Sequence, residues 1–255
     1  VKTVTAAVLV IGDEILSGRT QDTNSSYIAR WLGELGIGLG EIRVVPDVEE
    51  EIVTALNSLR HRYDYVFSTG GIGPTHDDIT ADAVAAAFGV PIGAHPQAMA
   101  ILAAHYRQGE FTEARRRMAR IPDGAELIDN PISRAPGFRI GNVFVLAGVP
   151  LIMQAMLDSL RHQLTGGKRV LSRAVGGAVA EGHVAAALGA LQAEFPDVKM
   201  GSYPYFTRSD PGSGLPSTYG VNFVLRSTDA QRLALAHEAD RAMIRAQGAE
   251  PHDRG

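Results

Sequence analysis

The chain reads TGGIGPTHDDIT over residues 69–80. An apolar run, Tyr63–Ser68, precedes this segment, and a helical pattern, Ala81–Phe88, follows it. Its three glycines let backbone amides approach a phosphate closely, and such N–H groups, together with the start of the next helix, form an anion cradle. The segment therefore predicts a phosphate-binding loop between a buried strand and a helix. The alternative is a plain tight turn in which Asp78 or Thr80 caps the helix.

Buried strands alternate with helices on both sides of this segment. Three further short apolar runs, each ending in a turn, are Val4–Ile11, Gly40–Val45 and Val143–Leu146. Helical patterns lie between and after them at Asn24–Leu35, Glu49–Arg62, His95–Tyr106 and Leu151–Leu164. This alternation predicts an α/β fold with a doubly wound, mostly parallel sheet. Ligands bind beyond the carboxyl ends of the strands in such sheets, which is where the glycine-rich and aspartate-rich segments fall.

A second, smaller domain is predicted after the sequence TGGK at residues 165–168. We therefore divide the chain into residues 1–166 and 167–255. The elements expected after this boundary are a strand at Arg169–Val175, a helix at Gly182–Phe195, strands at Lys199–Tyr205 and Tyr219–Arg226, and a helix at Asp229–Gln247. That order predicts a small α+β domain of the βαββα type.

Composition excludes several classes of site and partner. The 255 residues carry a net charge of −4, so there is no overall basic field and we expect no nucleic-acid partner. The chain has no cysteine, so any metal must bind to oxygen or histidine. The apolar start Val1–Ile11 is too short to span a membrane and lacks a secretory cleavage pattern. We therefore expect a cytoplasmic protein without a membrane partner.

Three segments carry a resemblance to a known superfamily. Residues 69–80 resemble the signature TGG-x-G-x-x-x-x-D-[IV]-T of the molybdopterin-binding domains of the MoaB/MogA and gephyrin type. The sequences GDEILSG at 12–18, followed by Asp22-Thr23-Asn24, and PDGAELIDNPISRAPGF at 122–138 resemble the CinA branch of that superfamily. Together these segments cover roughly the first 165 residues, and they imply a MoaB/MogA-like fold that commonly self-associates, as a dimer or trimer.

The resemblance also implies which residues form the site. Asp78 would lie next to the reacting phosphate, and Asp47 would be a second family aspartate. The two carboxylates could hold Mg²⁺, Mn²⁺ or Co²⁺, with K⁺ as a further candidate, or they could position water. No haem, flavin or nicotinamide is expected as a prosthetic group. The predicted ligand-binding residues are Gly12, Asp13, Glu14, Asn24, Thr69, Gly70, Gly71, Gly73, His76, Thr80, Arg134 and Gly148.

Several of these residues have simpler interpretations. Asp13 and Glu14 could belong to a capped turn, and Asn24 could be the N-cap of the following helix. His76 could donate to a phosphate oxygen or transfer a proton, but an exposed polar loop residue is the slightly favoured alternative.

The sequence departs from the CinA pattern in two places. It reads LAGVPLIM at 146–153, where the family commonly has Leu-Pro-Gly-x-Pro followed by Glu-Met. It reads NPISRAPG at 130–137 in place of Asn-Pro-x-Gly-Thr-Ala-Pro-Gly, so Arg134 adds a guanidinium that could clamp a phosphate. The nearby run Arg115-Arg116-Arg117 is interpreted as a solvated helix face, with a ligand rim or subunit contact as the alternative.

Three functions remain open at this point. The resemblance favours a metal-assisted hydrolase that cleaves the diphosphate of ADP-ribose or FAD. The alternatives are adenylyl transfer to molybdopterin and a non-catalytic module that binds a nucleotide or pterin. In the second domain, GSYPYF at 201–206 resembles a segment of stand-alone CinA-like proteins and of the domain fused in eukaryotic FAD synthases.

Overall fold

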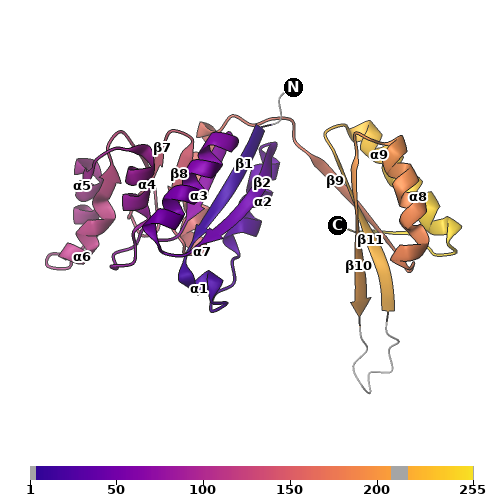
Figure 1. The fold of residues 1–255 in the computed structure, drawn as a ribbon, viewed down its shortest axis with the longest axis horizontal. Coiled ribbons are helices and arrows are strands. Elements are labelled where there is room, and N and C mark those ends of the chain that lie inside the picture. The colour runs from indigo at the N-terminus through magenta and orange to yellow at the C-terminus, as the bar shows by residue number, and fades with distance from the viewer. Residues whose placement is uncertain (1–3, 208–217, 255) are drawn as a thin grey trace, which may run out of the picture. The chain divides into compact units, whose positions relative to one another are not determined.

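The computed structural model describes residues 4–207 and 218–254 and divides into two compact units, Val1–Lys168 and Arg169–Gly255 (Figure 1). The division lies two residues beyond the boundary expected from the sequence. The first unit contains two hydrophobic cores and the second contains one.

The first unit is organised around a six-stranded mixed sheet with the order β2-β1-β3-β8-β7-β6. Its parallel strands are β1 (Val4–Ile11), β2 (Ile37–Val45), β3 (Tyr65–Thr69) and β8 (Val143–Leu146). The antiparallel extension consists of β7 (Gly137–Ile140) and β6 (Glu126–Ile128). A separate two-stranded sheet pairs β4 (Ile92–Ala94) with β5 (Arg120–Pro122). The predicted α/β class with a mostly parallel sheet is confirmed.

Helices pack on both faces of this sheet. One face is covered by α2 (Asn24–Glu34) and α7 (Pro150–Leu160), and the other by α3 (Glu49–Arg62), α4 (Thr80–Phe88) and α5 (Pro96–His105). Strand β1 shows the reason, since its residues alternate between the two cores: Ala7, Leu9 and Ile11 face one, and Ala6, Val8 and Val10 face the other. A strand buried on both faces reads as a continuous apolar run, as β1 does. The sheet is therefore doubly wound.

Shorter helical segments connect these elements. They are α1 (Asp13–Leu16), α6 (Glu113–Arg116) and the 3₁₀ helices η1 (Arg117–Ala119) and η2 (Arg161–Gln163). None of the helices in the described part of the chain combines the length and the apolar character that a bilayer-spanning helix requires.

The differences from the sequence prediction concern short or terminal elements. Strand β2 begins at Ile37 rather than at Gly40, and the last predicted residues of α7 form η2. The sequence did not indicate β4, β5, β6 or β7. Each of these has only three or four residues, which is too short for an alternating pattern to stand out from the surrounding loops.

The second unit is a small α+β domain, as predicted, and its sheet is antiparallel. Its elements are β9 (Leu171–Gly177), α8 (Glu181–Glu194), β10 (Lys199–Thr207), β11 (Thr218–Ser227), α9 (Ala230–Ala246) and β12 (His252–Arg254). The strand order is β10-β11-β9-β12, so β12 adds one strand to the expected βαββα arrangement. Its core contains Val175, Phe223 and Leu225 from the sheet and Ala236 and Ile244 from α9.

Helix α9 buries a carboxyl group in this second core. Asp240 is 0% exposed, and neither of its carboxyl oxygens has a hydrogen-bond partner among the described residues. Burial raises the pKa of Asp240 to about 7, because a poorly solvated site disfavours the charged form. The folded domain therefore retains this proton at pH values where the unfolded chain, with an aspartate pKa of about 3.9, has released it.

We expect the second domain to lose stability as the pH rises. The contribution of Asp240 is fully present below about pH 4 and is lost as the pH rises to the folded-state pKa near 7. An Asp240→Asn variant should be more stable than wild type at about pH 8, and this advantage should shrink towards about pH 4. Calorimetric unfolding of the full chain across this range measures the difference. An advantage of Asp240→Asn that does not change with pH would contradict the assignment.

Candidate functional site

The parallel strands of the first unit end at one edge of the sheet. In the register, Thr69 at the end of β3 pairs with Val10 of β1 and Leu146 of β8, and Ile11 of β1 pairs with Val45 of β2. The loops that follow these four strands therefore meet at the carboxyl edge, where ligands bind in doubly wound sheets. Most of the predicted site residues lie in these loops.

The glycine loop packs backbone against backbone at this edge. Gly70 has φ +102°, and a Cβ there would collide with the carbonyl oxygen of Ile11. Gly71 has φ +66°, and a Cβ there would collide with Oγ1 of Thr80. Thr80 fixes the loop, because its Oγ1 donates to the Gly70 carbonyl at 2.9 Å and its backbone N–H donates to the Gly71 carbonyl at 3.0 Å. This loop conformation therefore requires glycine at both positions.

Asp78 is held inside the same loop. Its Oδ2 accepts hydrogen bonds from the backbone N–H of Thr75, at 2.7 Å, and from the Thr75 hydroxyl. Gly73 leaves room for this carboxylate, since a Cβ at Gly73 would lie 2.6 Å from Oδ2. The N-cap of α4 is Ile79 and makes no side-chain cap bond, so the interpretation of Asp78 or Thr80 as a helix cap is wrong.

A second group of carboxylates gathers around Asp47. The backbone N–H of Asp13 donates to Oδ2 of Asp47 at 3.0 Å. Burial raises the pKa of Asp47; the Asp13 hydrogen bond opposes this, and the charges of Asp13, Glu14 and Asp77 raise it further. Across residues 4–207 and 218–254, no three His, Asp or Glu side chains are placed to hold a metal ion by themselves.

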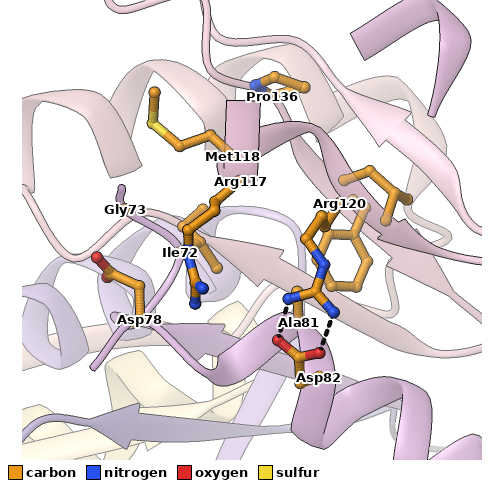
Figure 2. A pocket seen from close by; sticks show the side chains of 12 residues that line it. Ile72, Gly73, Asp78, Ala81, Asp82, Arg117, Met118, Arg120 and Pro136 are labelled. Carbon is orange, nitrogen blue, oxygen red and sulfur yellow. Dashed lines mark hydrogen bonds and ion pairs between the residues drawn. The ribbon is translucent and has the colours of Figure 1, made fainter. Parts of the chain in front are cut away.

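Two cavities flank the glycine loop. The first, here the Arg117 cavity, is shown in Figure 2 and is lined by residues including Gly71, Gly73, Asp78, Asp82, Arg117 and Arg120. The second, here the Asn24 cavity, is lined by residues including Glu14, Thr20, Asn24, Thr69, Gly70 and Gly148. The loop thus forms a wall of both cavities, and eight of the predicted ligand-binding or catalytic residues line one or the other.

Asn24 provides a buried polar group in the second cavity. It is the first residue of α2 and is 7% exposed, while Thr23 is the N-cap, so the interpretation of Asn24 as the cap is wrong. Its Nδ2 donates to the Gly148 carbonyl at 2.7 Å. Its Oδ1 is buried and finds no partner in the part of the chain that the structure describes. An unpaired buried acceptor is costly, so this oxygen is suited to a donor group on a ligand.

Six of the predicted residues line neither cavity: Gly12, Asp13, Asp47, His76, Thr80 and Arg134. Two of them, His76 and Arg134, have side chains on the surface. The His76 side chain is 97% exposed, with its Nδ1 3.9 Å from the Asp77 carboxylate. Arg134 has a positive φ of 62°, and its guanidinium lies 3.5 Å from the Asp129 carboxylate. Neither residue is among those that line the Arg117 or Asn24 cavity.

The preferred interpretation of residues 115–117 as a solvated helix face does not hold for Arg117, which lines a cavity as the alternative of a ligand rim implies. Arg116 lies on the surface beside Glu113, at 3.9 Å, as expected for a solvated helix face. Helix α6 ends at Arg116, however, and η1 turns the chain so that Arg117 lines the cavity. Three consecutive arginines carry no signal that separates the third from the first two. Arg117 is set apart by the change from the α-helix α6 to the 3₁₀ helix η1, and this change depends on packing against the rest of the unit.

Comparisons with known proteins cover both units. Residues 7–165 match the family model "Probable molybdopterin binding domain", and residues 169–253 match "FAD synthase, middle domain". A CinA-like protein of Citrifermentans bemidjiense is 44% identical over 167 residues, which are 63% of this chain and 40% of that protein. A protein of Caldivirga maquilingensis is 41% identical over 62% of this chain and 64% of its own length. The match thus spans between two fifths and two thirds of these relatives.

A solved structure of a CinA protein is also similar to this chain. The crystal structure of the protein CinA with unknown function from Thermoplasma acidophilum superposes with a TM-score of 0.60 at 35% identity. The superposition covers 64% of this chain and 99% of that one. Because the first family model spans more than half of the chain, this protein belongs to the molybdopterin-binding domain family, with CinA-like relatives.

Proposed function

We propose that the chain binds the diphosphate of a dinucleotide such as ADP-ribose or FAD at the glycine loop and hydrolyses it with the help of a divalent cation. The observation that carries this proposal is the position of the Asp78 carboxylate, which Thr75 holds against a loop flanked by two cavities. The family matches support a ligand that joins a heterocycle to phosphate, since one is named for molybdopterin binding and the other for FAD synthase.

The residues of the site suit this reaction. Loop amides between Gly70 and Gly73 would bind phosphate oxygens, as glycine-rich loops before helices do. Asp78 would accept a hydrogen bond from a water molecule and orient it for attack on one phosphorus. The new P–O bond forms with the water oxygen, the Asp78 carboxylate takes up the proton that the water loses, and the bridging oxygen leaves with the other phosphate. The Oδ1 of Asn24 would accept a hydrogen bond from an amino group of the heterocycle.

The carboxylates around Asp47 suit a cation that the ligand helps to bind. Mg²⁺ usually keeps several water ligands and binds through one or two carboxylates together with substrate phosphates, so it needs no cage of three side chains. Burial is the main cause of the raised pKa of Asp47, and the charges of Asp13, Glu14 and Asp77 add to it. These neighbouring negative charges mark a place where positive charge is favourable. Asp47 is the expected ligand, with Asp13 and Glu14 nearby. When bound, the cation would offset charge that develops on the phosphoryl group.

Product analysis tests the reaction. We expect AMP release from FAD or ADP-ribose in the presence of Mg²⁺, Mn²⁺ or Co²⁺, with K⁺ tested as an addition and NAD as a further substrate. Asp78→Asn should abolish AMP release while preserving the fold, because an amide oxygen can still accept from Thr75. Asp158→Asn makes the same chemical change at an exposed position of α7 and should leave activity intact.

Two results would contradict this assignment. Full activity in Asp78→Asn would remove Asp78 from the mechanism. Intact substrates under every cation condition would overturn hydrolysis. A ligand that binds without turnover would then indicate a binding module.

Adenylyl transfer to molybdopterin is a second candidate, favoured by the match of residues 7–165 to a molybdopterin-binding domain. It would use the same loop to transfer an adenylyl group from a nucleoside triphosphate to the pterin phosphate rather than to water, with pyrophosphate as the leaving group. The two reactions differ in the acceptor. AMP released in the absence of any pterin supports hydrolysis, whereas adenylylated pterin formed only when molybdopterin is supplied supports transfer.

The glycine loop itself can be tested at Gly71. Alanine at this positive φ should cost about 1–2 kcal/mol of stability, and its Cβ would displace Thr80, so we expect weakened ADP-ribose binding. Gly89→Ala is a matched control, because Gly89 has the same φ of +66° but open space around it. Urea unfolding and isothermal titration calorimetry measure both effects. Unchanged affinity in Gly71→Ala would show that the loop is only a turn.

Cation binding should depend on pH through Asp47. Because the pKa of Asp47 is raised, its carboxylate takes up a proton at a higher pH than an ordinary aspartate does. Mn²⁺ affinity measured with ADP-ribose present should therefore fall as the pH is lowered towards this pKa, and Asp47→Asn should bind Mn²⁺ weakly at every pH. Electron paramagnetic resonance reports free Mn²⁺ directly. Wild-type affinity in Asp47→Asn would place the cation elsewhere.

A further inference from the structure

The Arg117 cavity contains a cationic side chain without a carboxylate partner. Arg117 forms no ion pair with the residues that the structure describes, and its Nε is buried and has no hydrogen-bond partner among them. Figure 2 shows its side chain reaching into the cavity between Asp78 and the paired side chains of Arg120 and Asp82. A buried charged donor without an acceptor is costly, so an acceptor supplied by a ligand would stabilise this arrangement.

The neighbouring arginine differs from Arg117 in this respect. Arg120 donates to both oxygens of Asp82, with Nη1 at 2.9 Å and Nη2 at 2.6 Å, a bidentate pair drawn as dashed lines in Figure 2. This pair offsets the charge of Arg120 and engages both of its terminal nitrogens. Of the two arginines that line the cavity, Arg117 is therefore the one whose charge and donors remain available.

The cavity also needs a cation if an anion is to enter it. The Asp78 carboxylate lines the same space and would repel a phosphate group. The glycine segment at residues 69–80 contains no lysine or arginine that could offset this repulsion. A guanidinium presents a planar set of donors that matches phosphate oxygens, and it stays charged at any pH at which the protein is folded.

We propose that the Arg117 cavity is the subsite for one phosphate group of the ligand and that Arg117 is its cationic contact. The proposal rests on the proposed function only in that the ligand carries a diphosphate. It places that phosphate beside Gly71, Gly73 and Asp78, and it leaves the Asn24 cavity for the remainder of the ligand.

Inorganic pyrophosphate and adenosine are suitable probes, since one carries only the phosphates and the other lacks them. Isothermal titration calorimetry with the full chain should show pyrophosphate binding weakened about 10- to 100-fold in Arg117→Gln, the loss expected for one charge-assisted contact. Arg116→Gln is the matched control, since it removes the same charge from the adjacent, surface-exposed residue. It should bind pyrophosphate as wild type does, and adenosine affinity should not change in either variant.

Thermal unfolding checks that both variants are folded. If Arg117→Gln is not, Arg117→Lys keeps the charge but not the planar set of donors, and it should bind pyrophosphate more weakly than wild type. The proposal is overturned if wild type does not bind pyrophosphate, if the folded Arg117 variants bind it as tightly as wild type, or if Arg116→Gln causes an equal loss. Hydrolysis is judged separately. Arg117-dependent pyrophosphate binding without AMP release from FAD or ADP-ribose would overturn hydrolysis alone.

Discussion

The close approach of Gly70 to the carbonyl group of Ile11 determines where the other groups at the carboxyl edge can lie. No side chain separates the glycine loop from the end of β1, and Gly148 approaches Gly70 from the loop after β8, where a Cβ would lie 3.2 Å from the Gly70 Cα. Three chain segments are thus stacked backbone to backbone. Two side chains hold these segments together. Thr80, the first residue of α4, donates to the Gly70 carbonyl, and Asn24, the first residue of α2, donates to the Gly148 carbonyl.

Charge is distributed unevenly around this stack. Asp13, Glu14 and Asp47 gather after β1 and β2, and Glu14 reaches the Asn24 cavity. On the other side of the loop, Arg117 and the neutralised pair of Arg120 and Asp82 line a cavity that also contains Asp78. A ligand with phosphate groups and a polar heterocycle would meet different electrostatic surroundings at its two ends, which would favour one orientation over the reverse.

The sequence was most informative where a long pattern or a strict steric requirement determines the structure. Strand β1 is continuously apolar from residue 6 to residue 11 because both of its faces are buried there. Gly70 and Gly71 mark backbone conformations that other residues rarely adopt. It was less informative where the outcome depends on tertiary contacts. The bonds from Thr75 to Asp78 and from Asn24 to Gly148, and the turn that sends Arg117 inward, follow from how the loops pack. Helix caps were the alternative interpretation of Asn24 and Thr80, but both side chains instead donate to backbone carbonyls of the stacked loops.

The glycine loop is a shared wall, and this has a thermodynamic consequence. Gly70 borders the Asn24 cavity and Gly71 borders the Arg117 cavity, so adjacent peptide units face the two spaces. Any shift of the loop that accompanies the filling of one cavity changes the shape of the other. Linkage requires that such an influence be mutual: if occupation of one cavity changes the affinity of the other by some factor, the converse effect has the same size. The two halves of a ligand at this loop would then not contribute additively to its binding free energy.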